Sequence, residues 1–344
     1  MLGSPVCDGC THIVSEPDRT QTTSATTSAR QARLRLLLRG IGLAAFGLIL
    51  SQIDIPDLVD LVRGASIGYL IAAVPLIFAI LGVKALRWGG ILRAVGIDLE
   101  LRTLMHAYLA SFYVGAVTPG RLGELIKVLY VTERGHPRSE AIFGTLLDRA
   151  WDIAFLVIVG SIAMLRFATF FAAPLYLVAA TALLLLLTFG GVVRNRGKGK
   201  AALRRVLGLV LPESFRATTE QVILEFVGHW TALCRRDFGI ALLGTLVSWL
   251  LYYMQIYLLT LGIGVPLPFS EMVLMVTFSS LLSLLPITVA GIGTRDVTLI
   301  ALFGLVGLPV EMAVALSLSI LALFTVNALM SLGFWYARPV QMPG

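Results

Sequence analysis

Two short segments of this sequence place charged side chains beside proline and glycine, inside stretches that are otherwise apolar. The first segment, Thr118–Glu124, reads Thr-Pro-Gly-Arg-Leu-Gly-Glu and is followed by Lys127. The second, Ala290–Asp296, reads Ala-Gly-Ile-Gly-Thr-Arg-Asp and comes shortly after Pro286. The planar fork of arginine binds phosphate through two parallel hydrogen bonds, so each segment carries a group suited to phosphate recognition.

The composition is that of a membrane protein with several helical spans. Of the 344 residues, 57% are hydrophobic and 14% are charged, against roughly 25% charged residues in soluble domains. The net charge is +7 and the mean hydropathy is +0.88. Because much of any globule faces water, a soluble protein of this length needs far more polar surface. These values exclude a disordered chain, a disulfide scaffold and almost any cytosolic enzyme.

Six apolar runs approach the length of about 20 residues that crosses the hydrocarbon core of a bilayer. Two shorter apolar regions, Thr103–Val131 and Met272–Leu308, are each interrupted by proline and glycine. The six predicted spans are Leu34–Leu50, Ile67–Val83, Ala141–Leu165, Phe167–Val193, Phe238–Leu261 and Met312–Tyr336.

Lysine and arginine in the short loops predict the orientation of the spans, because such residues accumulate on the cytoplasmic side. Basic residues around the first span, from Arg30 to Arg39, place the N-terminus in the cytoplasm. The largest loop, Arg194–Asp237, is also strongly basic and is expected to be cytoplasmic. An even number of crossings must separate the two, which makes Thr103–Val131 a re-entrant hairpin that enters from the cytoplasm and returns there. The alternative is that one short segment crosses and breaks the positive-inside pattern.

Met272–Leu308 is expected to form a second re-entrant hairpin, which enters from the outside and leaves the C-terminus cytoplasmic. Each hairpin has an apolar arm, a proline, a glycine-containing break, an arginine, an acid and a second apolar arm. Paired breaks of this kind in two halves point to a transporter site near the bilayer midplane. The predicted fold is an all-α polytopic membrane protein with about six full spans and two broken hairpins in an inverted repeat, about eight membrane segments. Ordinary turns between helices are the alternative.

Ionisable residues at membrane depth are costly, so each is expected either to bind substrate or to be paired. In the first hairpin we expect Arg121 to bind a lipid phosphate, while Glu124 holds that arginine or meets a cationic head group. Glu124 and Lys127 lie three positions apart and can also pair. A structural ion pair that closes the hairpin is therefore the alternative.

The predicted span Ala141–Leu165 carries Asp148, Arg149 and Asp152. The two aspartates are four positions apart and share a helix face, and Arg149 can pair with Asp152. We expect this face to line the site opposite the first hairpin, where Arg121 and Lys127 balance its charges. The alternative is a buried charge network that only fixes helix packing.

In the second hairpin, Gly291, Gly293, Arg295 and Asp296 complete the candidate substrate-binding residues. A helix that starts after Gly293 directs free N–H groups and a positive end toward the hairpin tip, which suits a phosphate. The alternative is plain N-capping by Thr294, with Asp296 stabilising the helix start.

Lys84, Arg87 and Trp88 stand at the end of the predicted span Ile67–Val83. Tryptophan and long cationic side chains are enriched where spans meet the membrane surface. We therefore interpret these residues as interface anchors, with head-group contact as the alternative.

Four of these pieces together resemble the lysylphosphatidylglycerol synthase transmembrane region, also called the flippase-like integral membrane family. The pieces, in order along about Arg33 to Tyr336, are Lys84–Trp88, Thr118–Glu124, Leu147–Arg149 with Asp152, and Gly291–Asp296. The resemblance implies a protein that moves a polar-headed lipid across the bilayer. In bifunctional members an aminoacyl-transferase domain follows, and since this chain ends at Gly344 a stand-alone membrane module is expected. Asp296 stands where many relatives have Glu, and Thr118 where an amide is frequent, which bears on substrate identity.

The sequence contains no P-loop spacing and no metal-ligand pair, so neither ATP hydrolysis nor a metal or other cofactor is expected. The excess of basic residues is explained by the positive-inside pattern. A nucleic-acid partner is therefore not expected.

The predicted organisation is a disordered polar tail (1–32), one flippase-like transmembrane domain (33–338) with a basic cytoplasmic loop (194–237), and a short tail (339–344). The leading hypothesis is a non-enzymatic lipid translocator of the cytoplasmic membrane, whose partner is a phospholipid or a polyprenyl-phosphate-linked lipid. The second hypothesis is an intramembrane transferase acting on such a lipid, with Asp148, Asp152 or Glu124 as acid or base. The third is a non-catalytic membrane partner of a lipid-modifying transferase.

Overall fold

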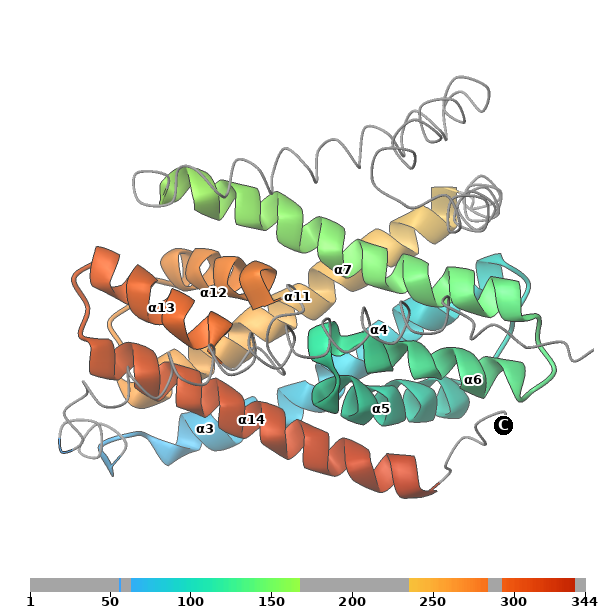
Figure 1. Cartoon of the computed structure of the whole chain (residues 1–344), viewed down its shortest axis with the longest axis horizontal. Coiled ribbons are helices and arrows are strands. Elements are labelled where there is room, and N and C mark those ends of the chain that lie inside the picture. Colours follow the sequence, from blue (N-terminus) through green and yellow to red (C-terminus); the bar gives the residue numbers. More distant parts are fainter. Residues whose placement is uncertain (1–55, 57–62, 168–234, 284–292, 338–344) are drawn as a thin grey trace, which may run out of the picture.

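The computed structural model of the chain is a bundle of helices (Figure 1). It describes residues 56, 63–167, 235–283 and 293–337, and every regular element in these ranges is helical. The predicted tails, the span Leu34–Leu50 and nearly all of Phe167–Val193 lie outside the described residues, as does the basic loop up to residue 234. The all-α prediction is confirmed for the part of the chain that the structure describes.

Within these ranges, three helical stretches are long and apolar enough to cross a membrane. They are α3 (Ile67–Ala73) continued by α4 (Pro75–Ala94), α11 (Arg235–Ile263) and α14 (Val310–Ala337). At about 1.5 Å per residue, a stretch of 28 residues extends about 42 Å, which exceeds the hydrocarbon core of about 30 Å. The predicted spans that correspond to these candidate spans are Ile67–Val83, Phe238–Leu261 and Met312–Tyr336.

Helix α7 (Arg138–Arg166) is unbroken over the whole of the predicted span Ala141–Leu165. It has 29 residues, as many as α11, but the charged residues Asp148, Arg149 and Asp152 in its central part make it less apolar. Charged side chains on such a helix need partners on the neighbouring helices.

The predicted hairpin Thr103–Val131 folds as two helices joined by a tight turn. Helix α5 (Leu101–Val117) leads into the 3-10 helix η1 (Pro119–Ile126), and α6 (Lys127–Thr132) returns beside α5 (Figure 1). Proline disfavours helical backbone at the residue before it, which explains why α5 ends here and why Thr118 is extended. The hydroxyl of Thr118 then accepts a hydrogen bond from the backbone N–H of Gly123 at 2.8 Å and holds the turn closed.

The second predicted hairpin, Met272–Leu308, also consists of two helices in contact. These are α12 (Phe269–Ser283) and α13 (Thr294–Leu305). Residues 284–292, which join them, lie outside the described residues, so the expected turn at Pro286 and Gly291 is a prediction.

Helices from the two halves of the chain pack in pairs: α4 against α11, α5 against α14, and α7 against α12 (Figure 1). Near the end of α4, Gly90 faces Ile240 at the start of α11. At the other end, the Gln255 side chain of α11 donates a hydrogen bond to the backbone oxygen of Ala73 at 2.8 Å. The two long helices therefore run antiparallel along most of their lengths.

The apolar core has two main parts. One part lies among α11, α12, α13 and α14 and includes Met272, Leu299 and Phe303; the other lies around α4 and α5 and includes Trp88 and Leu92. Many large apolar side chains also point outward, among them Leu243, Leu250 and Leu329. An extensive apolar exterior is typical of a surface that contacts lipid.

Gly123→Ala is expected to destabilise the first hairpin, because a Cβ at this position would meet the backbone carbonyl of Val114. Overpacking of this kind costs about 1–3 kcal/mol. We expect a lower midpoint of thermal unfolding for the purified protein in detergent. The matched control is Gly304→Ala, whose Cβ would meet nothing within 4 Å and which should not lower the midpoint. Equal midpoints for the two variants would contradict the tight turn.

Candidate functional site

Arg87 of α4 lies at the centre of a polar network inside the bundle. Its Nε donates to Asp148 Oδ1 and its Nη1 donates to Asp152 Oδ1, both at 2.9 Å. Nη1 also donates to Thr245 Oγ1 of α11 at 2.9 Å. The Arg87 side chain is fully buried, and Gly244 of α11 leaves room for its methylene stem. Arg87 therefore holds α4, α7 and α11 together through charge-assisted hydrogen bonds.

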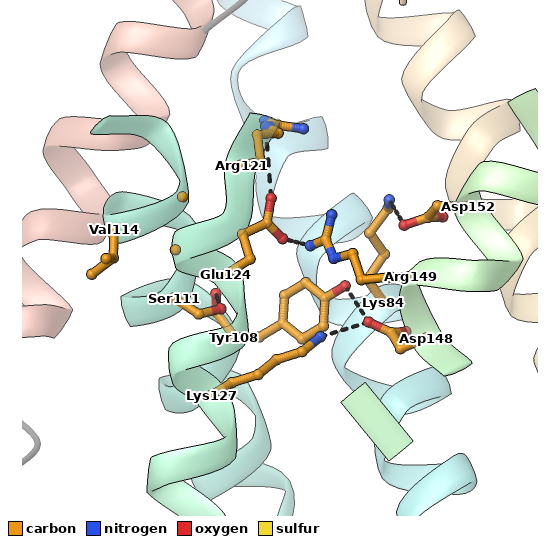
Figure 2. A network of polar contacts seen from close by, with 12 residues as sticks. Lys84, Tyr108, Ser111, Val114, Arg121, Glu124, Lys127, Asp148, Arg149 and Asp152 are labelled. Atoms are coloured by element: carbon orange, nitrogen blue, oxygen red, sulfur yellow. Dashed lines mark hydrogen bonds and ion pairs between the residues drawn. The ribbon is translucent and has the colours of Figure 1, made fainter. Parts of the chain in front are cut away.

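Two lysines and a tyrosine complete the donors around the aspartates. Lys127 Nζ lies 2.6 Å from Asp148 Oδ2, and Lys84 Nζ lies 2.8 Å from Asp152 Oδ2. Tyr108 of α5 donates its hydroxyl to Asp148 Oδ2 at 3.0 Å (Figure 2). Both oxygens of each carboxylate thus accept hydrogen bonds, which offsets much of the cost of burying them.

Glu124 of η1 organises the second part of the network (Figure 2). Its carboxylate is ion-paired with Arg149 of α7, and its Oε1 lies 3.6 Å from Arg121 Nε. Glu124 is buried against α5, where Gly115 lacks the side chain that would occupy this space. Glu124 thus connects the turn of the first hairpin to α7.

Arg121 presents its charge beside two aromatic rings. Its backbone has a φ of 58°, a conformation that is uncommon for residues other than glycine. Its guanidinium lies over the rings of Phe112 on α5 and Phe324 on α14, at 5.2 and 5.4 Å from their centroids. Backbone strain of this kind is found preferentially at functional sites. Here it places a cation between the first hairpin and α14.

The network has a closed interior and an open rim. The side chains of Arg87, Lys127 and Asp148 are fully buried, whereas Arg121 keeps 42% and Arg149 keeps 23% of its side chain exposed. Lys84 is 19% exposed. The arrangement can therefore offer partly exposed cations to an anion while its interior stays fixed.

The structure brings together the six candidate residues of the first hairpin and the span Ala141–Leu165: Arg121, Glu124, Lys127, Asp148, Arg149 and Asp152. Lys127 pairs with Asp148, as expected of a cation that balances the aspartates, and not with Glu124. Arg149 pairs with Glu124 instead of Asp152. The reason is that α7 packs against η1 and α6, so contacts between elements replace contacts within one helix. A substrate-binding role for these residues stays a prediction.

The interpretation of Arg87 and Trp88 as interface anchors is wrong, because both are buried, with 1% and 0% of their surface exposed. Lys84, Tyr108 and Trp249 also belong to the network. Trp249 Nε1 donates to Asp152 Oδ1 at 3.2 Å. A signal for Arg87 was present in the sequence. Two aspartates on one face of a span require cations at the same depth, and Arg87 and Lys84 share a face of a neighbouring span.

The second hairpin carries a smaller polar cluster at the start of α13. Arg295 Nη2 lies 2.9 Å from Asp296 Oδ1, which also accepts a hydrogen bond from the hydroxyl of Ser317 on α14. Asp296 Oδ2 accepts the backbone N–H of Gly293 at 2.8 Å. The N-cap is Gly293, with a φ of 92°, and not Thr294 as the capping alternative expected. Asp296 does stabilise the helix start, and Gly291 lies outside the described residues.

Arg87→Met is expected to destabilise the fold strongly, because it removes the guanidinium that donates to both buried aspartates and leaves Asp148 Oδ1 without its donor. Breaking a buried ion pair on one side costs about 3–5 kcal/mol. Thermal unfolding in detergent should show a large drop in midpoint. The control Arg102→Met changes an exposed arginine and should leave the midpoint unchanged. A drop of the same size in the control would contradict the role given to Arg87.

Comparison with known proteins shows the family of this chain. The model of the lysylphosphatidylglycerol synthase transmembrane region matches residues 34–331. A UPF0104 membrane protein of Pyrococcus horikoshii is 23% identical over 307 residues, which cover 83% of this chain and 91% of the relative. A UPF0104 membrane protein of Methanothermobacter thermautotrophicus is 23% identical over 296 residues, covering 80% and 86% of the two chains. The chain therefore belongs to the family of the lysylphosphatidylglycerol synthase transmembrane region.

Proposed function

We propose that this protein translocates a polar-headed phospholipid or a related lipid phosphate across the cytoplasmic membrane without changing it chemically, with both termini in the cytoplasm. The observation that carries the proposal is a network of cations and carboxylates within an apolar helical bundle, with Arg121, Arg149 and Lys84 at its open rim. Ionisable groups at such a position serve a function or are paired. The pairing here leaves partly exposed cations, which suit an anionic head group.

The position of the network along α7 supports a site deep in the membrane. Asp152 lies at the middle of this helix, equally far in sequence from Arg138 and Arg166. A helix of 29 residues that crosses the bilayer places its middle near the midplane. Transporters of several folds bind their substrates at this depth, between repeats.

The proposal includes the two re-entrant hairpins. Glu124 of η1 is ion-paired with Arg149 in the central part of α7, so the turn of the first hairpin lies at the depth of the network. In Figure 1 the α5–α6 hairpin comes from the end of the bundle where α7 begins. The α12–α13 pair comes from the opposite end, where α14 begins. The two helix pairs thus enter the bundle from opposite ends.

The order, length and packing of the helices support an inverted repeat. The stretch α3–α4 and α11, α5 and α12, and α7 and α14 have similar lengths and are displaced along the chain by about 170 residues. Contacts are exchanged as a two-fold axis requires, since α5 packs against α14 while α12 packs against α7. The antiparallel direction of these pairs follows from the contacts Phe112–Phe324, His106–Phe334, Gly160–Leu281 and Arg166–Glu271.

A transferase has less support from the geometry. Asp148 and Asp152 each accept hydrogen bonds from two cationic side chains, and Glu124 is ion-paired with Arg149. Carboxylates occupied in this way are poorly placed to take a proton from a substrate. We therefore propose a transporter without enzymatic activity, and a lipid-modifying transferase acting beside it remains a predicted partner.

Arg149→Ala and Arg295→Ala are each expected to abolish lipid transport while the protein still inserts into membranes. The reason is that each variant removes a cation from one of the two hairpin sites. Fluorescent phospholipids in proteoliposomes, quenched from outside, measure how fast the inner leaflet becomes accessible. The control is Arg166→Ala, which removes an arginine 56% exposed and paired with Glu271, away from the network. If inner-leaflet lipid becomes accessible in both Arg149→Ala and Arg295→Ala as fast as in the wild-type protein, this site would be ruled out.

A further inference from the structure

The network contains more cations than carboxylates. Its contacts join the cations Lys84, Arg87, Arg121, Lys127 and Arg149 to the carboxylates Glu124, Asp148 and Asp152. The part around the two aspartates has three cations for two acids, and the part around Glu124 has two cations for one acid. Each part thus holds one positive charge in excess among the residues that the structure describes.

The excess charge lies where a ligand can reach it. The cations with the greatest side-chain exposure are Arg121 and Arg149, followed by Lys84, whereas Arg87 and Lys127 are fully buried. Arg149 Nε is buried and has no hydrogen-bond partner within the described part of the chain. A buried donor without an acceptor is rare in folded proteins, so Arg149 Nε is available to donate to an anion that reaches this side chain.

Glu124 indicates the geometry of that group. Its carboxylate faces Arg121 with one oxygen and Arg149 with the other, which is how a phosphate bridges two arginines. Lys84 adds a third cation on the same side of the network (Figure 2). An anion that enters here gains contacts to partly exposed cations without breaking the closed interior.

We propose that the site is matched to a lipid with a terminal phosphate monoester, which carries two negative charges, rather than to a phosphodiester lipid, which carries one. This inference rests on the proposed function, because it takes the network to be the head-group site. Unmatched charge is costly in surroundings of low polarity, so a ligand with two charges neutralises the network while a ligand with one leaves it positive. The phenylalanines under Arg121 provide an apolar wall beside the phosphate.

The test compares dioleoyl phosphatidic acid, a phosphate monoester, with dioleoyl phosphatidylglycerol, a phosphodiester with the same chains. Binding to the purified full-length protein in detergent is titrated at pH 8 and pH 5. The second ionisation of a phosphate monoester lies near pH 6, so phosphatidic acid carries about two charges at the first pH and about one at the second. We expect the monoester to bind about tenfold tighter than the diester at pH 8, and the ratio to approach one at pH 5. The diester at both pH values controls for titration of the protein.

Two variants change the charge excess in opposite directions. Arg121→Gln, at a partly exposed position, should reduce the preference for the monoester at pH 8, whereas Glu124→Gln should maintain or increase it. Arg149→Gln repeats the first test should Arg121→Gln bind no lipid at all. Inorganic phosphate is expected to compete only weakly, since it lacks the lipid chains. Competition as strong as that of phosphatidic acid would assign the site to a free anion and overturn the proposal.

Equal affinities for the two lipids at pH 8, or a preference that Arg121→Gln and Arg149→Gln leave unchanged, would also overturn the inference. The proposed function would survive that result if proteoliposomes still show lipid translocation. Conversely, charge-selective binding without translocation in the wild-type protein would refute the proposed function and leave the binding site in place.

Discussion

The cost of holding charge in an apolar bundle is the constraint on which the rest of the structure depends. An unpaired ion at the centre of a membrane costs about 2.5–3.5 kcal/mol on insertion scales. Arg87 meets this constraint by binding Asp148 and Asp152 together, and its fully buried side chain fixes how α4 lies against α7. The close approach of α11 follows, because Gly244 makes room for the arginine stem and Thr245 accepts one of its hydrogen bonds.

The same constraint holds the first hairpin in place. α6 is short and would be marginal alone, but Lys127 reaches Asp148, and Glu124 pairs with Arg149. Ion pairs as well as packing therefore hold the turn against the central part of α7. Because these bonds leave the rim partly exposed, the same network combines its structural role with the ligand-binding role that we propose for it. In the second hairpin a buried carboxylate also connects two helices, since Asp296 at the start of α13 accepts hydrogen bonds from Gly293 and from Ser317 of α14.

Much of this arrangement follows from the sequence, and the remainder depends on contacts between distant segments. The three candidate spans, α3 with α4, α11 and α14, are predictable because hydropathy and length alone identify them. The candidate site residues of the first hairpin and α7 are predictable because charged residues are rare in stretches that are otherwise apolar. Their pairing is not, since it depends on how helices cross: Arg87 and Asp148 are 61 residues apart in sequence. The prediction that Arg87 lies at the membrane surface is wrong for the same reason, because the sequence does not show whether a cation near the end of a span faces water or a buried aspartate.

The most direct test of the account is an electron cryomicroscopy map of the protein in lipid nanodiscs that contain phosphatidic acid. Such a map shows both the depth of the network in the bilayer and any head group bound to it. The account predicts that Asp152 lies near the midplane, with phosphate density between Arg121 and Arg149. A network at the level of the lipid head groups, or a rim without phosphate density, would contradict the claim that these buried charges form the path of a lipid head group.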